Sequence, residues 1–97
     1  MEKLVRDKIP EIMAKDGKQA KTRTADIEEW KKRLRDKLVE EATEYKHEPR
    51  PEELADILEV LNCLIEAEGL SLKEIETIRR EKIEKKGSFN KRIIAEF

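Results

Sequence analysis

The chain has 97 residues, of which 37% are hydrophobic and 46% are charged. With 22 Lys and Arg against 23 Asp and Glu, the formal net charge is -1, which excludes a strongly basic nucleic-acid-binding domain. No apolar run approaches the roughly 20 residues that a membrane-spanning helix requires. We therefore expect one domain over residues 1–97, with neither nucleic acid nor a membrane as its partner.

Cysteine content and the first residues indicate the compartment. The only cysteine, Cys63, excludes an intramolecular disulfide, which is typical of a reducing environment. The charged start of the chain is not followed by the apolar stretch of a signal peptide. We expect a cytoplasmic protein. Because a domain of this size buries only roughly 60–65% of its unfolded surface, we also expect it to form a homo-oligomer, and the family resemblance described below implies a homodimer or homotetramer.

The first predicted element is a short helix over about residues 6–15, where apolar residues recur at helical spacing. Gly17 ends it in the manner of a left-handed cap. The polar run 18–24 has no periodicity and predicts a loop. Either Thr24 or Asp26 is expected to cap the next helix.

Two long helices are predicted in the middle of the chain. The first carries one apolar stripe with steps of three or four residues, formed by Ile27, Trp30, Leu34, Leu38, Ala42 and Tyr45. Residues 47–51 break it, and Pro51 begins a second helix that extends to Ala67. The broad apolar face of this second helix predicts the centre of the core; it comprises Leu54, Ile57, Leu58, Leu61, Leu64 and Ile65.

The last predicted helix begins at a capping box formed by Ser71 and Glu74 and continues to Gly87. Residues 89–97 are expected to pack as a last helical turn or two. Since no segment alternates like a strand, the predicted fold class is all-α, an antiparallel helical bundle of about four helices completed by oligomerisation.

Four carboxylates fall on or beside the predicted apolar faces. Glu41 lies within the stripe of its helix and Glu44 one turn further, while Glu53 and Asp56 have the same spacing in the next helix. Because a short turn makes the two helices antiparallel, the four acids should converge. Oxygen ligands suit Mg²⁺, with Mn²⁺ as an alternative. The other interpretation is that they are ordinary solvated acids of an acid-rich chain.

No nucleophile relay is available, because His47 is the only histidine and lies in the segment that separates the two long helices. We expect His47 to be a surface residue and Cys63 a small buried filler. A carboxylate-bound metal that activates water suits hydrolysis of a phosphoanhydride. Lys37 lies four residues before Glu41 and is placed to hold phosphate, with a further basic cluster over residues 79–92.

The segment Lys37-Leu38-Val39-Glu40-Glu41-Ala42-Thr43-Glu44, followed by Glu53-Leu54-Ala55-Asp56, resembles the signature of the MazG-like all-α nucleoside triphosphate pyrophosphohydrolases. Residues 4–10 and 86–89 look like a small, house-cleaning branch of this superfamily, which includes phosphoribosyl-ATP pyrophosphohydrolase. Residues 45–52, between the two parts of the motif, are fewer than is common in the superfamily.

The resemblance implies Mg²⁺-dependent hydrolysis of a nucleoside triphosphate, canonical or non-canonical, to the monophosphate and pyrophosphate by a metal-activated water. It implies that Glu41, Glu44, Glu53 and Asp56 are metal ligands, that Glu40 assists or positions the water beside Glu41, and that Lys37, Lys82 and Lys86 bind the substrate. Two alternatives remain open: a phosphoribosyl-ATP pyrophosphohydrolase of histidine biosynthesis, and a non-catalytic helical assembly protein with a structural metal site.

Overall fold

The computed structural model describes residues 1–97 and contains four helices and no strand, as the sequence predicts. The helices are α1 (Ile9–Lys15), α2 (Ile27–His47), α3 (Pro51–Ala67) and α4 (Leu72–Lys86). None of them is long and apolar enough to cross a membrane.

Local side-chain chemistry sets the starts of the helices. Asp26, and not Thr24, caps α2, since its Oδ1 accepts a 2.8 Å hydrogen bond from the Glu29 amide. Ser71 caps α4 in the same way, with its hydroxyl accepting a 3.1 Å hydrogen bond from the Glu74 amide. The first helix starts later than predicted, at Ile9, because Pro10 lacks an N–H and is tolerated only in a first turn.

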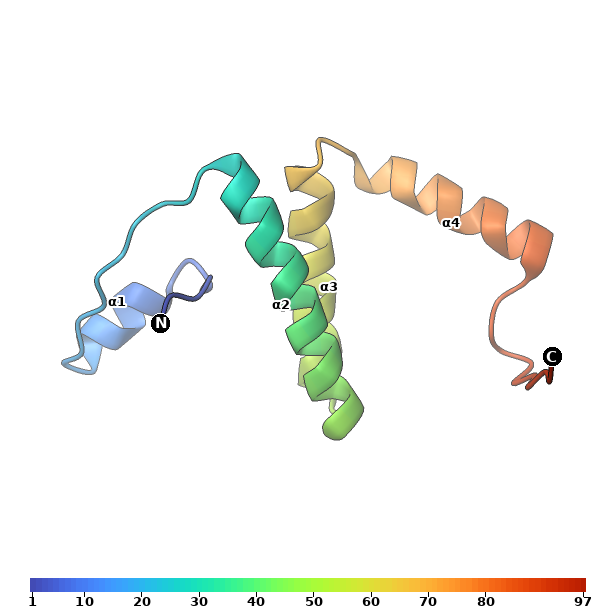
Figure 1. The fold of residues 1–97 in the computed structure, drawn as a ribbon, viewed down its shortest axis with the longest axis horizontal. Helices are drawn as coiled ribbons and strands as arrows, with labels where there is room; N and C mark the ends of the chain where they lie inside the picture. Colours follow the sequence, from blue (N-terminus) through green and yellow to red (C-terminus); the bar gives the residue numbers. More distant parts are fainter.

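The centre of the molecule is the hairpin of α2 and α3, which residues 48–50 join and which pack side by side and antiparallel (Figure 1). Leu34 of α2 and Val60 of α3 are the only hydrophobic residues buried in this seam, 3% and 8% exposed. The apolar face of α3 therefore divides into one edge that meets α2 and another that remains open.

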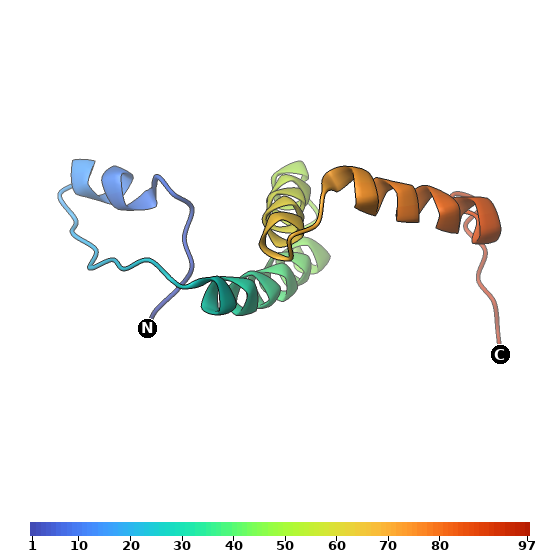
Figure 2. The same ribbon diagram turned by 90° about the horizontal axis from the view of Figure 1, so that it is seen from above.

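The other two helices lie apart from the hairpin. Helix α4 meets α3 only weakly, α1 packs on no other helix, and the two extend to opposite sides (Figures 1 and 2). The radius of gyration is 17.3 Å, against about 12.5 Å for a compact domain of this length. One copy of the chain thus forms a helical hairpin with two appended helices, and does not by itself close the predicted four-helix bundle.

A large apolar surface is consequently exposed. On α3, Leu54, Leu58 and Leu61 follow one another at helical spacing and are 47%, 63% and 38% exposed. Further large hydrophobic side chains are exposed on α2 and α4; these are Ile27, Val39, Leu72, Ile78 and Ile83. The prediction that α3 forms the centre of a core holds within one chain only for its edge facing α2.

The prediction of a final helical turn in residues 89–97 is wrong. The chain makes a single turn, with the Arg92 amide donating to the Phe89 carbonyl at 3.2 Å, and is otherwise without regular structure. Phe89, Ile94 and Phe97 are almost fully exposed. Nothing in the same chain lies where these side chains could pack, so no burial compensates the cost of ordering a short helix.

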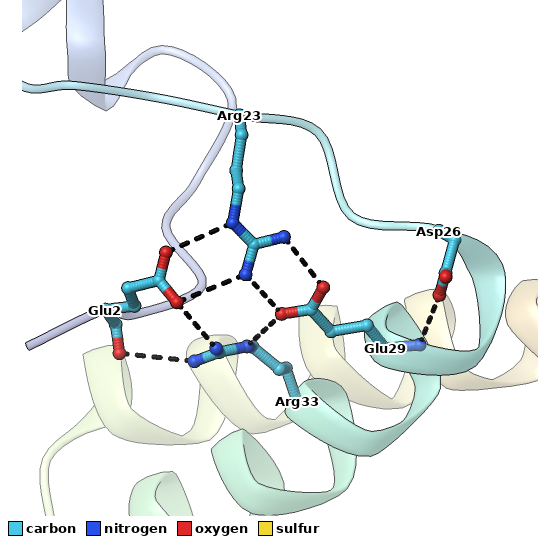
Figure 3. Close-up of polar contacts among 5 residues, drawn as sticks. All are labelled: Glu2, Arg23, Asp26, Glu29 and Arg33. Atoms are coloured by element: carbon cyan, nitrogen blue, oxygen red, sulfur yellow. Dashed lines mark hydrogen bonds and ion pairs between the residues drawn. The ribbon is translucent and has the colours of Figure 1, made fainter.

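Residues 1–8, which we call the N-terminal arm, lie along the start of α2 and are fixed by ion pairs. Arg23 is the centre of this network, because its guanidinium donates to the carboxylates of both Glu2 and Glu29 (Figure 3). Arg33 also donates to Glu29, at 3.0 Å, and to the backbone carbonyl of Glu2, at 3.2 Å. The arm is thus attached to α2 by charged groups and not by a packed helix.

Candidate metal centre

Two carboxylates occupy places in the α2–α3 seam where hydrophobic side chains would be expected. Glu41 lies two helical turns after Leu34 on α2, and Glu53 lies two turns before Val60 on α3. Each acid therefore points into the same seam as the buried hydrophobic residue of its helix. These four residues are the only buried ones in the chain, so half of its buried positions are carboxylates.

The structure brings all the predicted acidic site residues into two overlapping groups. Glu41, Glu53 and Asp56 each offer an oxygen, and these oxygens lie within 4.8 Å of one another. Glu40, Glu41 and Glu44 form a second group with the same limit. Glu41 is common to both groups, so we call the five residues the carboxylate cluster. The antiparallel packing of α2 and α3 creates it, because it sets the end of one helix beside the start of the other.

Burial distinguishes Glu41 and Glu53 from ordinary helix acids. Each is 7% exposed, and the Oε2 atom of each is buried without a hydrogen-bond partner. A buried charged oxygen without a partner costs about 1–3 kcal/mol or more. The seam therefore contains two carboxylate oxygens that accept no hydrogen bond from the protein.

Three basic side chains lie at the rim of the cluster. Lys37 Nζ lies 3.9 Å from Glu41 Oε1 and 3.7 Å from Glu40 Oε2. Arg50 Nη2 donates a 2.9 Å hydrogen bond to Glu53 Oε1. Each buried acid thus has one cation beside Oε1 and none beside Oε2, which leaves the cluster with an excess of negative charge.

The third rim cation comes from the N-terminal arm. Arg6 Nη2 donates a 2.7 Å hydrogen bond to Asp56 Oδ1. Sequence reasoning missed both arginines. Arg50 leaves a local signal, since it precedes Pro51 and stands three residues before Glu53 on the same helix face. Arg6 and Asp56 are far apart in the sequence, so the spacing of residues does not predict that they pair.

Electrostatics in the cluster act most strongly on Glu41. Burial, followed by the negative charges of Glu44 and Asp56, raises the pKa of the Glu41 carboxyl, and Lys37 opposes this only in part. Ionisation of Glu41 is therefore less favourable in the folded protein than in water. A cation placed among these oxygens would stabilise the ionised form.

The predicted substrate-binding lysines fall in different places. Lys37 lies beside the cluster, as its position before Glu41 predicts. Lys82 and Lys86 are exposed on α4, which runs away from α2, so one chain does not bring them to the carboxylates (Figure 1). His47 is exposed at the end of α2, and Cys63 is half-buried, with its thiol 3.6 Å from a Glu59 oxygen. Neither belongs to the cluster.

The donor set is suited to a hard divalent cation. It consists only of carboxylate oxygens, which Mg²⁺ and Mn²⁺ prefer, and contains no histidine or thiolate that would favour zinc. The unpartnered oxygens of Glu41 and Glu53 are the groups that such an ion would satisfy. The residues present therefore fit a divalent metal.

Comparison of the chain with protein families, with curated proteins and with solved structures finds no match.

Proposed function

We propose that the chain is a Mg²⁺-dependent nucleotide pyrophosphohydrolase of the MazG-like type, which cleaves a nucleoside triphosphate to the monophosphate and pyrophosphate. The observation that carries the proposal is the pair of unpartnered, buried oxygens on Glu41 and Glu53, within a cluster that also includes Asp56. A carboxylate on a helix surface normally remains hydrated, because burying it without a partner costs free energy. A bound metal compensates that cost, so metal ligands can be buried.

The position of each acid in the carboxylate cluster indicates its role in the proposed reaction. Glu41, Glu53 and Asp56 would hold the metal, and Glu44 completes the set from the α2 side of the cluster. When bound, Mg²⁺ supplies positive charge that activates water and offsets charge on phosphate oxygens. Glu40 belongs to the cluster but keeps a 41% exposed side chain. Its carboxylate can accept the proton of the attacking water while remaining in contact with solvent.

The cations at the rim of the cluster are suited to binding the phosphate groups of the substrate. Lys37 and Arg50 lie beside the buried acids and can contact phosphate oxygens that approach the metal. Such contacts strengthen as charge moves to the leaving pyrophosphate, so they stabilise the transition state more than the bound substrate.

We also propose that the active form is a homo-oligomer, with a dimer as the smallest assembly. The chain exposes 9178 Å² of surface, against about 5,800 Å² for a compact monomer of this mass. The excess of about 3,400 Å² per chain is larger than the roughly 1,000–2,500 Å² that each partner covers in a typical obligate dimer, which favours an extensive interface or a larger assembly. The exposed stripe of Leu54, Leu58 and Leu61 supplies a self-complementary apolar surface.

A second copy also explains the direction of α4. This helix leaves the hairpin with Leu72, Ile78 and Ile83 exposed, so it is available to pack on another chain. We propose that in such an assembly Lys82 and Lys86 contact the carboxylate cluster of the neighbouring copy.

The test is release of pyrophosphate from a panel of canonical, deoxy and modified nucleoside triphosphates, with and without Mg²⁺. We compare the natural chain with Glu41→Gln, and with Glu66→Gln as a matched control, because Glu66 is an exposed acid of α3 without an ion pair. We expect Mg²⁺-dependent release that Glu41→Gln reduces by about two orders of magnitude or more and Glu66→Gln preserves.

Adding phosphoribosyl-ATP to the panel, and measuring Mg²⁺ binding to the same protein by titration calorimetry, separates the alternatives. Release from phosphoribosyl-ATP alone would redirect the proposal to histidine biosynthesis. Metal binding without release from any nucleotide would favour a structural metal site in a helical assembly protein. Equal activity of Glu41→Gln and the natural chain would refute the site.

A further inference from the structure

The N-terminal arm, which the proposed function does not use, connects the start of α2 with the carboxylate cluster. Its start is fixed to α2 through Glu2, and its end places Arg6 on Asp56 of the carboxylate cluster. Every other residue that forms a hydrogen bond or ion pair with the cluster belongs to the α2–α3 hairpin or to the turn within it. The arm is thus the one segment from outside the hairpin that reaches the site.

The contact between Arg6 and Asp56 is exposed to solvent, unlike Glu41 and Glu53 of the same cluster. The two side chains are 60% and 37% exposed, so their ion pair is screened by water and contributes only about 0–1 kcal/mol. A dication among several carboxylates binds a ligand oxygen far more strongly than a single exposed guanidinium does. Asp56 can therefore exchange Arg6 for a metal at little cost.

Release from Asp56 would not remove Arg6 from the site. Glu2 stays attached to Arg23 and Arg33 by side-chain and backbone contacts (Figure 3). Between Glu2 and Arg6 a fully extended chain spans at most about 13–14 Å. The tether thus limits how far Arg6 can move from the anchored Glu2, while the guanidinium donors become free.

A guanidinium in this position is suited to one class of ligand. Its planar donors match the oxygens of a phosphate group and can form two parallel hydrogen bonds. The same group also repels a metal that approaches Asp56 in the absence of phosphate. Arg6 should then weaken metal binding on its own and strengthen phosphate binding once the metal is present.

We propose that Arg6 is a phosphate-binding residue of the site, held on Asp56 in the metal-free protein and released to the triphosphate when Asp56 becomes a metal ligand. This inference rests on the proposed function and adds to it a residue from the N-terminal arm. It assigns to the arm the delivery of a positive charge to the polyphosphate of the substrate.

The test compares Arg6→Gln with a matched control. Arg35 pairs with Glu68 at 2.6 Å, and the exposed fractions of that pair, 61% and 37%, are almost those of the Arg6 pair. Arg35→Gln therefore removes an equivalent ion pair away from the cluster. Titration calorimetry measures binding of Mn²⁺ alone, then of inorganic triphosphate in the presence of Mg²⁺, at constant ionic strength. Circular dichroism checks that both variants keep the helices.

We expect Arg6→Gln to bind Mn²⁺ roughly three- to tenfold more tightly and inorganic triphosphate about tenfold more weakly than the natural chain. Arg35→Gln should change neither affinity by more than about twofold. Arg6→Lys keeps the positive charge but loses the planar guanidinium that can donate two parallel hydrogen bonds. It should therefore bind Mn²⁺ as the natural chain does and triphosphate with intermediate affinity.

The opposite outcomes are distinct. An unchanged or weakened affinity of Arg6→Gln for Mn²⁺ would show that Arg6 does not compete for Asp56. An unchanged affinity for triphosphate would show that it is not a phosphate ligand. Either result overturns the inference and leaves the metal site intact. If the natural chain itself binds no Mn²⁺, the proposed function fails, and the role of Arg6 fails with it.

Discussion

Replacing Glu41 by glutamine should make the metal-free protein more stable, although it damages the site. Glu41 is 7% exposed, its Oε2 atom has no partner, and the charges of Glu44 and Asp56 repel it. Glutamine keeps the shape and the carbonyl acceptor, removes the buried charge, and adds an N–H₂ group that can donate to a neighbouring carboxylate. The buried seam therefore loses an electrostatic penalty without gaining a cavity.

The magnitude follows from the cost of leaving a buried polar group unsatisfied, about 1–3 kcal/mol, of which Lys37 at 3.9 Å recovers a part. We expect Glu41→Gln to add about 1–2 kcal/mol to the free energy of unfolding in the absence of metal. For a domain of this length each kcal/mol raises Tm by about 4–8 °C.

The pH dependence has a definite sign. Because the folded protein raises the pKa of Glu41, the unfolded chain loses this proton first as pH rises. The metal-free natural chain should therefore lose stability as pH increases from about 4.5 through the raised pKa. Glu41→Gln should lack that loss, so the two proteins should converge in stability at low pH and differ most once the pH exceeds the raised pKa of Glu41.

Thermal unfolding at one protein concentration checks these statements, in a chelator and in Mg²⁺, with Glu66→Gln as the control. We expect Glu41→Gln to melt above the natural chain in chelator, and Mg²⁺ to raise Tm only for the natural chain and the control. A Glu41→Gln protein that melts lower in chelator at pH 7, or that gains as much from Mg²⁺, would refute the reasoning.

Three further predictions concern the rest of the molecule. Leu58→Glu places a charge on the exposed stripe of α3, and light scattering should show a monomer with its helices retained; an unchanged mass would exclude this surface as the interface. The pKa of Glu29 is lowered to about 2 by Arg23 and then Arg33, so the attachment of the N-terminal arm should persist above pH 4.5 and weaken as pH falls toward 2. A carboxyl-carbon NMR titration should give that midpoint, and one near 4.5 would mean that the ion pairs do not form in solution. Asp26→Ala should cost about 1 kcal/mol in urea unfolding and Thr24→Ala almost nothing, whereas equal losses would contradict the cap.

The helix boundaries were predictable where a neighbouring side chain sets them. Ser71 and Pro51 act within a few residues of themselves, so their effect can be read from spacing. Apolar spacing alone predicts a start of α1 that is too early, because it takes no account of the missing N–H of Pro10. Ile93 and Ile94 favour a helical C-terminal tail, but apolar residues stabilise a short helix only when a surface is there to cover them.

The carboxylate cluster was predictable for a related reason. The burial of Glu41 follows from its place in the apolar stripe of α2, and the convergence with Glu53 and Asp56 follows from the short connection between two antiparallel helices. The apolar periodicity of α2 and the length of the connection between α2 and α3 contain this information. They do not reveal which oxygens remain without a partner, which depends on the packing of individual side chains.

Contacts between distant parts of the chain could not be read in this way. Arg6 pairs with Asp56, and the ion pairs of Glu2 fix the same arm along α2, but none of these partners is close in sequence. The direction of α4 is likewise undetermined by its own residues. Its position decides whether Lys82 can approach the cluster, and that depends on the surface that covers its apolar side chains.

The central claim is that the buried carboxylates of the α2–α3 seam bind a divalent metal. A crystal structure of the natural chain grown with Mn²⁺, with anomalous scattering recorded at the manganese edge, tests it most directly. We predict an anomalous peak about 2.0–2.3 Å from oxygens of Glu41, Glu53 and Asp56, with Arg6 displaced from Asp56. A structure in which Mn²⁺ is absent from this cluster, or binds only elsewhere on the surface, would contradict the claim.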